Sequence, residues 1–346
     1  MKRILILYRE LAGYFVECLN HLCENYGVEA VVVAYPVNAD APFKFSLSEN
    51  ITVKNRREIS ASEIAQLVSD PQFDLIFCGG WSDKDYLNAL KNRKTKSLLG
   101  FDNQWNGTLK HAASSVYARF RIKPLFEYAF VPGTKQVQFA QHMGFGNHNI
   151  ITGAYSCDTL KFSSLSPTRK GRIANEKKRL IYTGRYAKEK FINPLCTIMK
   201  ELINEGTNSW ELHCIGTGPM WENRMEGDDI IHHGFMQPEE LFSFMKTGDA
   251  FILPSTFEPW GVVVHEFAAA GYPMVLSTNV GAAEAFLVDN QNGFLFESGN
   301  ANDLKDKLKK LFMLSNESLM RMGEKSAELA LKISPDTWAK SLYQIM

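Results

Sequence analysis

Residues 251–266, with the sequence FILPSTFEPWGVVVHE, carry the clearest structural signal in this chain. The apolar run Ala250–Leu253 predicts a buried strand, and Pro254 ends it. The periodic segment Gly261–Ala270 predicts a helix. The stretch therefore supplies a strand, then a loop that contains Glu258, then the open start of a helix.

This order of elements predicts a ligand site. In an open α/β sheet, ligands bind at the carboxyl ends of the strands. The free N–H groups and partial positive charge of a helix start suit a phosphate. Glu258 and Glu266 are eight positions apart, so they can contact two ends of one ligand without sharing a helix face. Glu266 stands among apolar residues, and its carboxylate is costly to bury unless a group such as a ribose hydroxyl pairs with it.

The same residues resemble a known family. The E-x7-E spacing behind Leu253-Pro254-Ser255 is similar to the donor-site signature of the retaining glycosyltransferases of family 4, which have the GT-B fold. The sequences AAAGYPMV at 268–275 and NGFL at 292–295 fit the same family, as do TGR at 183–185 with Lys190 and GTGP at 216–219. The similarity is dense over about residues 178–312 and loose in the first half. Each motif alone is weak, and their common order carries the resemblance.

The resemblance implies an α/β protein with two Rossmann-like α/β/α domains that face a cleft, and a C-terminal helix that crosses back to the N-terminal domain. It implies transfer of a sugar from a nucleoside diphosphate donor, UDP-sugar before GDP-sugar, to a hydroxyl of a glycan or lipid-linked acceptor, with the anomeric configuration retained. Bacterial cell-surface polysaccharide or lipopolysaccharide synthesis is the setting expected at the family level. We expect neither a metal nor a cofactor, because the sugar nucleotide is itself a substrate.

Four residues are expected to take part in catalysis, namely Glu258, Arg185, Lys190 and Asp102. Arg185 and Lys190 flank a short loop between a strand and a helix, and an arginine can bind two phosphate oxygens at once. By resemblance, these two cations bind the donor diphosphate, Glu258 binds the sugar hydroxyls and Glu266 binds the ribose. The donor-binding residues expected beside them are Gly13, Gly184, Gly216, Phe235, Trp260, Gly261, Val262, Val263 and Glu266.

Three of these expectations have an alternative. For Arg185 and Lys190, the alternative is that they form ordinary surface salt bridges. Gly13 follows the first strand and is a place where backbone can approach a phosphate, or it is only a turn glycine. The full G-x-G-x-x-G fingerprint is absent, which disfavours a dinucleotide. Asp102 follows the predicted strand Lys96–Phe101 at a place where the family often carries a histidine. We expect an acceptor-side role for Asp102, and the alternative is that it caps a helix over Leu109–Ala118.

Length and composition indicate the number of domains and narrow the classes of protein to which the chain can belong. A chain of 346 residues predicts two domains, which we place at 1–155 with the terminal helix 335–346, and at 179–334, joined by a linker at 156–178. The 38 basic and 38 acidic residues balance, so the composition does not favour nucleic-acid binding. No apolar run is long enough to span a membrane. The six cysteines form no C-x-x-C pair, which is typical of reduced thiols in the cytoplasm.

The region 84–123 is locally basic. Such a surface suits anionic lipid head groups at the inner face of a membrane, and the alternative is an ordinary solvated face. Two rival functions stay open: another GT-B enzyme, such as a sugar-nucleotide epimerase or an inverting transferase, and a non-catalytic nucleotide-binding partner subunit. The sequence leaves the oligomeric state open.

Overall fold

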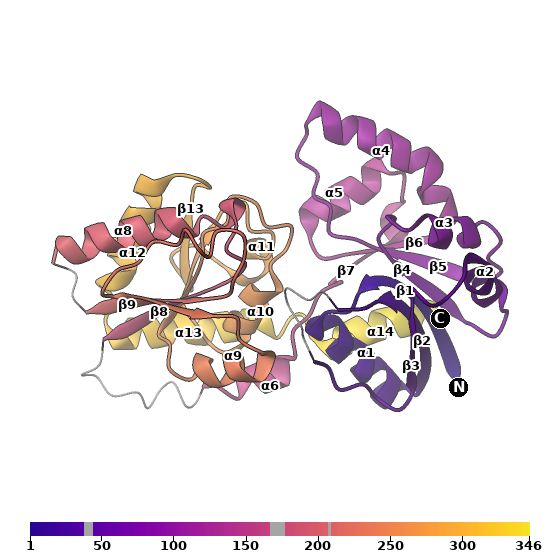
Figure 1. Ribbon diagram of the computed structural model, residues 1–346, viewed down its shortest axis with the longest axis horizontal. Helices are drawn as coiled ribbons and strands as arrows, with labels where there is room; N and C mark the ends of the chain where they lie inside the picture. The colour runs from indigo at the N-terminus through magenta and orange to yellow at the C-terminus, as the bar shows by residue number, and fades with distance from the viewer. Residues whose placement is uncertain (38–43, 167–176, 207–208) are drawn as a thin grey trace. The chain divides into compact units, whose positions relative to one another are not determined.

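The computed structural model describes residues 1–37, 44–166, 177–206 and 209–346. The chain divides into two compact units, and each is described by itself. The N-terminal unit comprises residues 1–156 with 333–346, and the C-terminal unit comprises 157–332. Each unit is built on one sheet of parallel strands with helices packed against it (Figure 1).

The sheet of the N-terminal unit has seven strands in the order β3-β2-β1-β4-β5-β6-β7. The order reverses between β1 and β4, which makes this the topological switch point of the sheet. Its strands are β1 (Lys2–Glu10), β2 (Val28–Tyr35), β3 (Ile51–Asn55), β4 (Leu75–Gly79), β5 (Lys96–Gly100), β6 (Tyr128–Val131) and β7 (Ile150–Thr152).

Two apolar cores cover the two faces of this sheet, because alternate strand residues point to opposite faces. One core joins Ile4 and Ile6 of β1 to α1 and α14, and the other joins Leu5 and Leu7 to α2, α3, α4 and α5. The helices are α1 (Gly13–Tyr26), α2 (Ala61–Ser69), α3 (Lys84–Leu90), α4 (Leu109–Arg121), α5 (Thr134–His142) and α14 (Pro335–Ile345).

The sheet of the C-terminal unit has six strands in the order β10-β9-β8-β11-β12-β13. They are β8 (Lys178–Thr183), β9 (Trp210–Ile215), β10 (Ile230–Gly234), β11 (Ala250–Leu253), β12 (Met274–Ser277) and β13 (Gly293–Phe296). The helices are α6 (Thr159–Ser163), α8 (Ile192–Asn204), α9 (Pro238–Met245), α10 (Val262–Ala269), α11 (Ala283–Phe286), α12 (Ala301–Phe312) and α13 (Asn316–Ala330). The fully buried strand β11 lies near the middle of the sheet, between β8 and β12.

The last helix returns to the N-terminal unit, which confirms the expected crossing of the C-terminus. α14 packs against α1, and the indole of Trp338 is buried in the core on that face. Its Nε1 donates a hydrogen bond to the Ala154 carbonyl at 3.0 Å. Ser334 caps the helix by accepting from the Thr337 N–H, and Pro335 takes the first helical position, where no N–H is needed.

The structure corrects several sequence-based boundaries. Residues 159–163 of the predicted linker form α6, which packs on α10 in the C-terminal unit, while 167–176 lie outside the described residues. β3, α3 and α11 were not predicted. Gly13 is the first residue of α1 and not a turn glycine.

All six cysteines are buried free thiols. Among the described residues, we find no helix with the length and apolarity that crossing a bilayer requires.

Candidate functional site

The predicted donor residues of the C-terminal unit gather at one edge of its sheet. They follow the ends of four parallel strands, and the carboxyl ends of parallel strands meet at a common edge. Gly184, Arg185 and Lys190 follow β8, Gly216 follows β9, Phe235 follows β10, and Glu258, Trp260, Gly261, Val262, Val263 and Glu266 follow β11.

An ion pair joins two of these loops. Nζ of Lys190, at the end of a short 3-10 turn (Lys188–Lys190), donates to Oε2 of Glu258. Both side chains are mostly buried, with 18% and 15% of their surface exposed. The backbone reinforces this contact, because the Thr256 N–H donates to the Glu189 carbonyl at 2.7 Å. The pair therefore holds a cation and a carboxylate together at the strand edge.

The loop that carries Glu258 is fixed by its own backbone. The Glu258 N–H donates to the Asn279 carbonyl and the Glu258 carbonyl accepts from the Gly281 N–H, both at 3.1 Å. The Ala282 N–H donates to the Trp260 carbonyl at 2.9 Å. A short ladder to the loop after β12 thus positions the carboxylate independently of any ligand.

Gly261 connects this loop to α10 in a conformation that favours glycine. Its φ is 92°, in the left-handed region, and a Cβ there would lie 3.0 Å from Cγ of Glu258 and 3.3 Å from Cδ2 of Leu253. Glycine therefore permits both the sharp turn and the position of Glu258. No side chain caps α10, so its start presents backbone N–H groups at Val262 and Val263.

Glu266 lies in the second turn of α10, in apolar surroundings. Burial raises the pKa of its carboxyl group from an ordinary 4.5 to about 7, and the positive charge of Lys161 opposes that rise. No side chain among the described residues hydrogen-bonds to this carboxylate. A hydrogen-bond donor that offsets the cost of desolvating this carboxylate must therefore come from a ligand or solvent.

Glycines bring the loops after β8 and β9 into contact. Gly216 has a φ of 129°, and a Cβ there would lie 2.1 Å from the Gly184 carbonyl oxygen. The Gly184 N–H donates to the Ile215 carbonyl at 3.0 Å. Arg185 extends from this junction with an exposed side chain, and no carboxylate in the described part of the chain pairs with it. The edge thus carries one arginine with its guanidinium free of an ion pair.

Three buried polar atoms lie at the same edge, and of their residues only Trp260 was among the predicted donor-binding residues. Oγ1 of Thr183, Oγ of Ser255 and Nε1 of Trp260 have no hydrogen-bond partner among the described residues. An unpaired buried polar group is costly, so such groups call for a partner outside the protein. Thr183 ends β8 and Ser255 lies two residues after β11, so their place next to predicted strand ends was the available signal.

Asp102 lies in the N-terminal unit, directly beyond β5. It does not cap the following helix, because Oγ1 of Thr108 accepts from the His111 N–H and takes that role. The alternative hypothesis, that Asp102 caps the helix after it, is therefore wrong. Its carbonyl accepts from Nε2 of Gln136 at 3.3 Å.

Tyr8, Tyr14 and Tyr155 lie close enough to Asp102 to interact with its charge, and no sequence motif indicated this cluster. Burial raises the pKa of Tyr155 well above its ordinary value, and the charges of Tyr14, Tyr8 and Asp102 with a hydrogen bond to Asp102 add to the rise. Burial likewise raises the pKa of Tyr14 to about 12. The rings of Tyr14 and Tyr155 meet edge to face at 5.1 Å. The phenols are therefore neutral hydrogen-bonding groups at ordinary pH.

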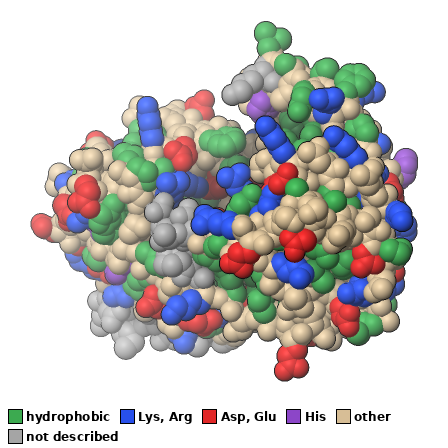
Figure 2. All heavy atoms as spheres, turned by 45° about the vertical axis from the view of Figure 1, so that its right-hand side comes forward, with side chains coloured by type: hydrophobic (Ala, Val, Ile, Leu, Met, Phe, Trp, Pro, Cys, Tyr) green, Lys and Arg blue, Asp and Glu red, His purple; other side chains and the backbone are tan. Residues whose placement is uncertain are grey.

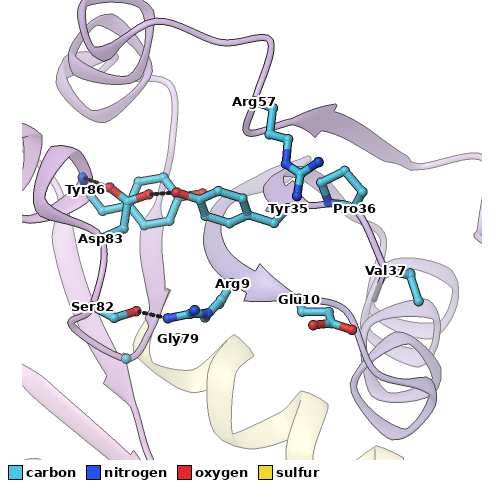
Figure 3. Close-up of a pocket in the computed structure, with 11 residues that line it drawn as sticks. Arg9, Glu10, Tyr35, Pro36, Val37, Arg57, Gly79, Ser82, Asp83 and Tyr86 are labelled. Carbon is cyan, nitrogen blue, oxygen red and sulfur yellow. Dashed lines mark hydrogen bonds between the residues drawn. The ribbon is translucent and has the colours of Figure 1, made fainter. Parts of the chain in front are cut away.

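A pocket of about 580 Å³ opens at the switch point of the N-terminal sheet (Figure 3). Its walls come from the ends of β1, β2 and β4, from Arg57 just after β3, and from the start of α3. Nη1 of Arg9 donates to Oγ of Ser82 at 3.2 Å, and the Tyr35 hydroxyl donates to Oδ2 of Asp83 at 2.9 Å. The lining residues are Arg9, Glu10, Tyr35, Pro36, Val37, Arg57, Gly79, Gly80, Ser82, Asp83 and Tyr86. Gly13 is not among them.

The Asp83-Lys84-Asp85 sequence beside this pocket has the spacing of an Asp-x-Asp metal motif. Its carboxylates are already paired, because Nε of Arg56 binds Asp83 at 2.8 Å and Nη2 binds Asp85 at 2.5 Å. Among the described residues, no three His, Cys, Asp or Glu side chains are grouped to hold a metal ion. Metal independence stays a prediction.

Comparison with solved structures identifies the architecture. Sucrose-phosphate synthase of Thermosynechococcus elongatus matches all of this chain and 98% of its own, with 13% identity and a TM-score of 0.75. HepE of Anabaena, solved in complex with UDP and glucose, matches 99% of both chains, with 15% identity and a TM-score of 0.72. The fold is GT-B. At this level of identity, the likeness shows the fold alone.

Sequence comparison concerns mainly the C-terminal unit. Residues 167–329 match the family described as Glycosyl transferases group 1. An uncharacterized glycosyltransferase of Methanocaldococcus jannaschii is 29% identical over 46% of this chain and 44% of its own length. The sulfoquinovosyl transferase of Arabidopsis thaliana is 31% identical over 40% of this chain and 28% of its own. The capsular polysaccharide biosynthesis glycosyltransferase CapM of Staphylococcus aureus is 28% identical over 51% of this chain and 46% of its own. The matched segments thus span less than half of each relative.

Proposed function

We propose that the chain is a retaining glycosyltransferase of the family 4 type that takes its sugar from a nucleoside diphosphate, with UDP-sugar favoured over GDP-sugar. The observation that carries this proposal is the edge of the C-terminal sheet. It combines Arg185 without an ion pair, Lys190 held by Glu258, and the uncapped start of α10. Cations and free N–H groups of this kind recognise a diphosphate.

Each group has a separate task in this proposal. When the bond between sugar and phosphate breaks, negative charge grows on the diphosphate, and Arg185, Lys190 and the N–H groups of Val262 and Val263 stabilise it without a metal. Glu258 accepts hydrogen bonds from the sugar hydroxyls.

The nucleoside end is assigned to the apolar side of the same edge. Glu266 accepts from the ribose hydroxyls, which supplies the partner that its desolvated carboxylate lacks. Backbone near Phe235, with the Gly184–Gly216 junction, borders the base. The unpaired Nε1 of Trp260 is a further donor for the ligand.

The acceptor hydroxyl is assigned to the N-terminal unit. Its switch-point pocket is lined by charged, hydroxyl and amide-backbone groups, which suit a polyhydroxylated glycan. Asp102 with its three tyrosines lies at the same carboxyl edge of the sheet and offers further hydrogen bonds. Relatives named for capsular polysaccharide biosynthesis and sulfoquinovosyl transfer support a glycan or lipid-linked acceptor. We place the reaction in the bacterial cytoplasm.

The test is a transfer assay with a panel of sugar nucleotides. The purified chain is incubated with UDP-, GDP-, ADP- and dTDP-sugars and a mixture of glycan acceptors, and nucleoside diphosphate release is measured. Proton NMR of the product gives the anomeric configuration. We expect one donor class to react and the product to keep the donor configuration. A rearranged sugar nucleotide, an inverted product or no reaction with any donor contradicts the proposal.

A further inference from the structure

Helix α4 of the N-terminal unit exposes its large apolar side chains to solvent instead of packing them against the unit's core. Large hydrophobic side chains point to solvent: Leu109 is 90% exposed, Phe120 71%, Tyr117 60% and Val116 55%. The side chains that face the unit are small, with Ser115 and Ala118 almost fully buried. A surface helix normally turns its apolar stripe toward the core.

These exposed residues form one stripe. At about 100° per residue, Leu109, Ala113, Val116, Tyr117 and Phe120 fall within an arc of roughly 100°. Thirteen large hydrophobic side chains are exposed in the described part of the chain, and four of them belong to this helix. Figure 2 shows hydrophobic side chains gathered at the top of the view, the region that α4 occupies in Figure 1. Such a concentration marks an interaction surface and not scattered exposure.

Positive charge borders the stripe on both sides. On the same helical projection, Arg119 and Arg121 fall on opposite sides of the apolar arc. No Asp or Glu occurs between positions 103 and 126, while this segment holds two lysines and two arginines. Neither arginine forms an ion pair with any described residue. An apolar face between cations is the pattern of a helix that lies in a membrane interface.

We propose that the α4 surface, defined as the exposed residues Leu109, Val116, Tyr117, Phe120, Arg119 and Arg121, docks the chain onto an anionic lipid bilayer. The apolar stripe enters the boundary between head groups and acyl chains, and the two arginines contact lipid phosphates. A second copy of the chain fits this surface less well, because a two-fold pairing through α4 brings the same cations together. The test uses no sugar donor, so its outcome is independent of the proposed transferase activity.

The experiment is flotation of the full chain with vesicles of phosphatidylcholine, with and without phosphatidylglycerol. We expect the chain to float with phosphatidylglycerol vesicles and to be released by salt, which screens the arginines. The double variant Leu109→Ser/Phe120→Ser should lower the partition coefficient by about tenfold or more, since both apolar contacts are lost. Arg119→Gln/Arg121→Gln should lower it by about 25-fold on anionic vesicles, at about fivefold per cation.

A matched control removes equally exposed apolar residues elsewhere. Met313 and Leu331 of the C-terminal unit are 83% and 59% exposed, so Met313→Ser/Leu331→Ser should float like the wild type. Circular dichroism and thermal unfolding establish that each variant is folded, and Val116→Ser/Tyr117→Ser supplies a second test of the stripe.

Three results would overturn the proposal. The wild type fails to float with anionic vesicles, or folded Leu109→Ser/Phe120→Ser floats as well as the wild type does. The third is a wild-type dimer in sedimentation velocity that the stripe variants convert to monomer without any flotation, because a protein partner then occupies the surface.

Discussion

Lys190 forms an ion pair with Glu258, so a donor diphosphate that binds Lys190 competes with this carboxylate. Glu258→Gln removes the competing charge and leaves Lys190 free, and it also removes the acceptor for sugar hydroxyls. We expect this variant to bind the nucleoside diphosphate several-fold more tightly, while turnover of the sugar nucleotide falls by at least about 100-fold. Titration calorimetry and the transfer assay measure the two effects.

Lys190→Ala is the contrasting variant. It removes a phosphate contact, so both nucleotide affinity and turnover should fall, affinity by about tenfold or more. Tighter nucleotide binding by Lys190→Ala, or unchanged turnover in Glu258→Gln, would remove these two residues from the site.

Glu266 makes the stability of the chain depend on pH. Its pKa rises from an ordinary 4.5 to about 7 on folding, because the carboxylate is desolvated. Between these pH values the folded state keeps a proton that the unfolded state has released, so the free energy of unfolding falls as pH rises. Glu266→Gln lacks this titration and should be more stable than the wild type by about 2–3 kcal/mol near pH 8, with no difference near pH 4.

Chemical denaturation of both proteins across this pH range is the measurement. The same variant should bind the nucleoside diphosphate more weakly, because an amide is a poorer acceptor for ribose hydroxyls than a carboxylate. A parallel pH dependence in the two proteins would show that Glu266 does not titrate as described.

Among the secondary-structure elements, α10 depends on Gly261, which allows the turn before the helix and leaves room for the Glu258 side chain. Gly261→Ala puts a Cβ at a φ of 92° and 3.0 Å from Cγ of Glu258. We expect a loss of about 1–3 kcal/mol in stability and a fall in turnover, because the carboxylate is displaced. Gly153→Ala is the control: its φ is 85°, and a Cβ there meets nothing within 4 Å. It should lose stability and keep full turnover.

The sequence predicted the elements whose signal is local. The strand β11 is fully buried and stands between turn residues, so it and the helix behind it were predicted with bounds close to those observed. β3 was missed because it is an edge strand with three exposed residues in a row, Thr52 to Lys54. The linker was predicted through α6 because a five-residue helix shows almost no period.

The candidate site was predictable where its residues follow successive strands of one sheet. Lys190 and Glu258 are 68 positions apart, and their pairing follows from the placement of β8 beside β11. The tyrosines around Asp102 were not predictable, because they come from three separate segments and share no motif. The exposure of the apolar stripe of α4 was not predictable either, because a periodic apolar face normally indicates the buried side of a helix.

At the scale of the whole molecule, α14 makes the N-terminal unit depend on the end of the chain. Trp338→Ala leaves a cavity under α1 and removes the hydrogen bond to Ala154. It should cost the N-terminal unit about 3–5 kcal/mol. Hydrogen exchange by mass spectrometry should show faster exchange in α1 and β1, with β8 and β11 unchanged.

Trp210→Ala is the matched variant in the other unit. Trp210 is fully buried and stacks on Phe312 with 4.8 Å between ring centroids. It should speed exchange in β8 and β9 and leave α1 unchanged. Equal effects of both variants on both units would show that the units do not unfold separately.

Titration calorimetry of nucleoside diphosphates into the wild type, Lys190→Ala and Arg185→Ala tests whether this edge of the C-terminal sheet is the donor site. The panel is UDP, GDP, ADP and dTDP, with NAD as the negative control. We predict that one diphosphate binds the wild type, that each variant binds it about tenfold more weakly or worse, and that NAD does not bind. No diphosphate binding by the wild type, or equal affinity in all three proteins, would contradict the assignment of this edge as the donor site.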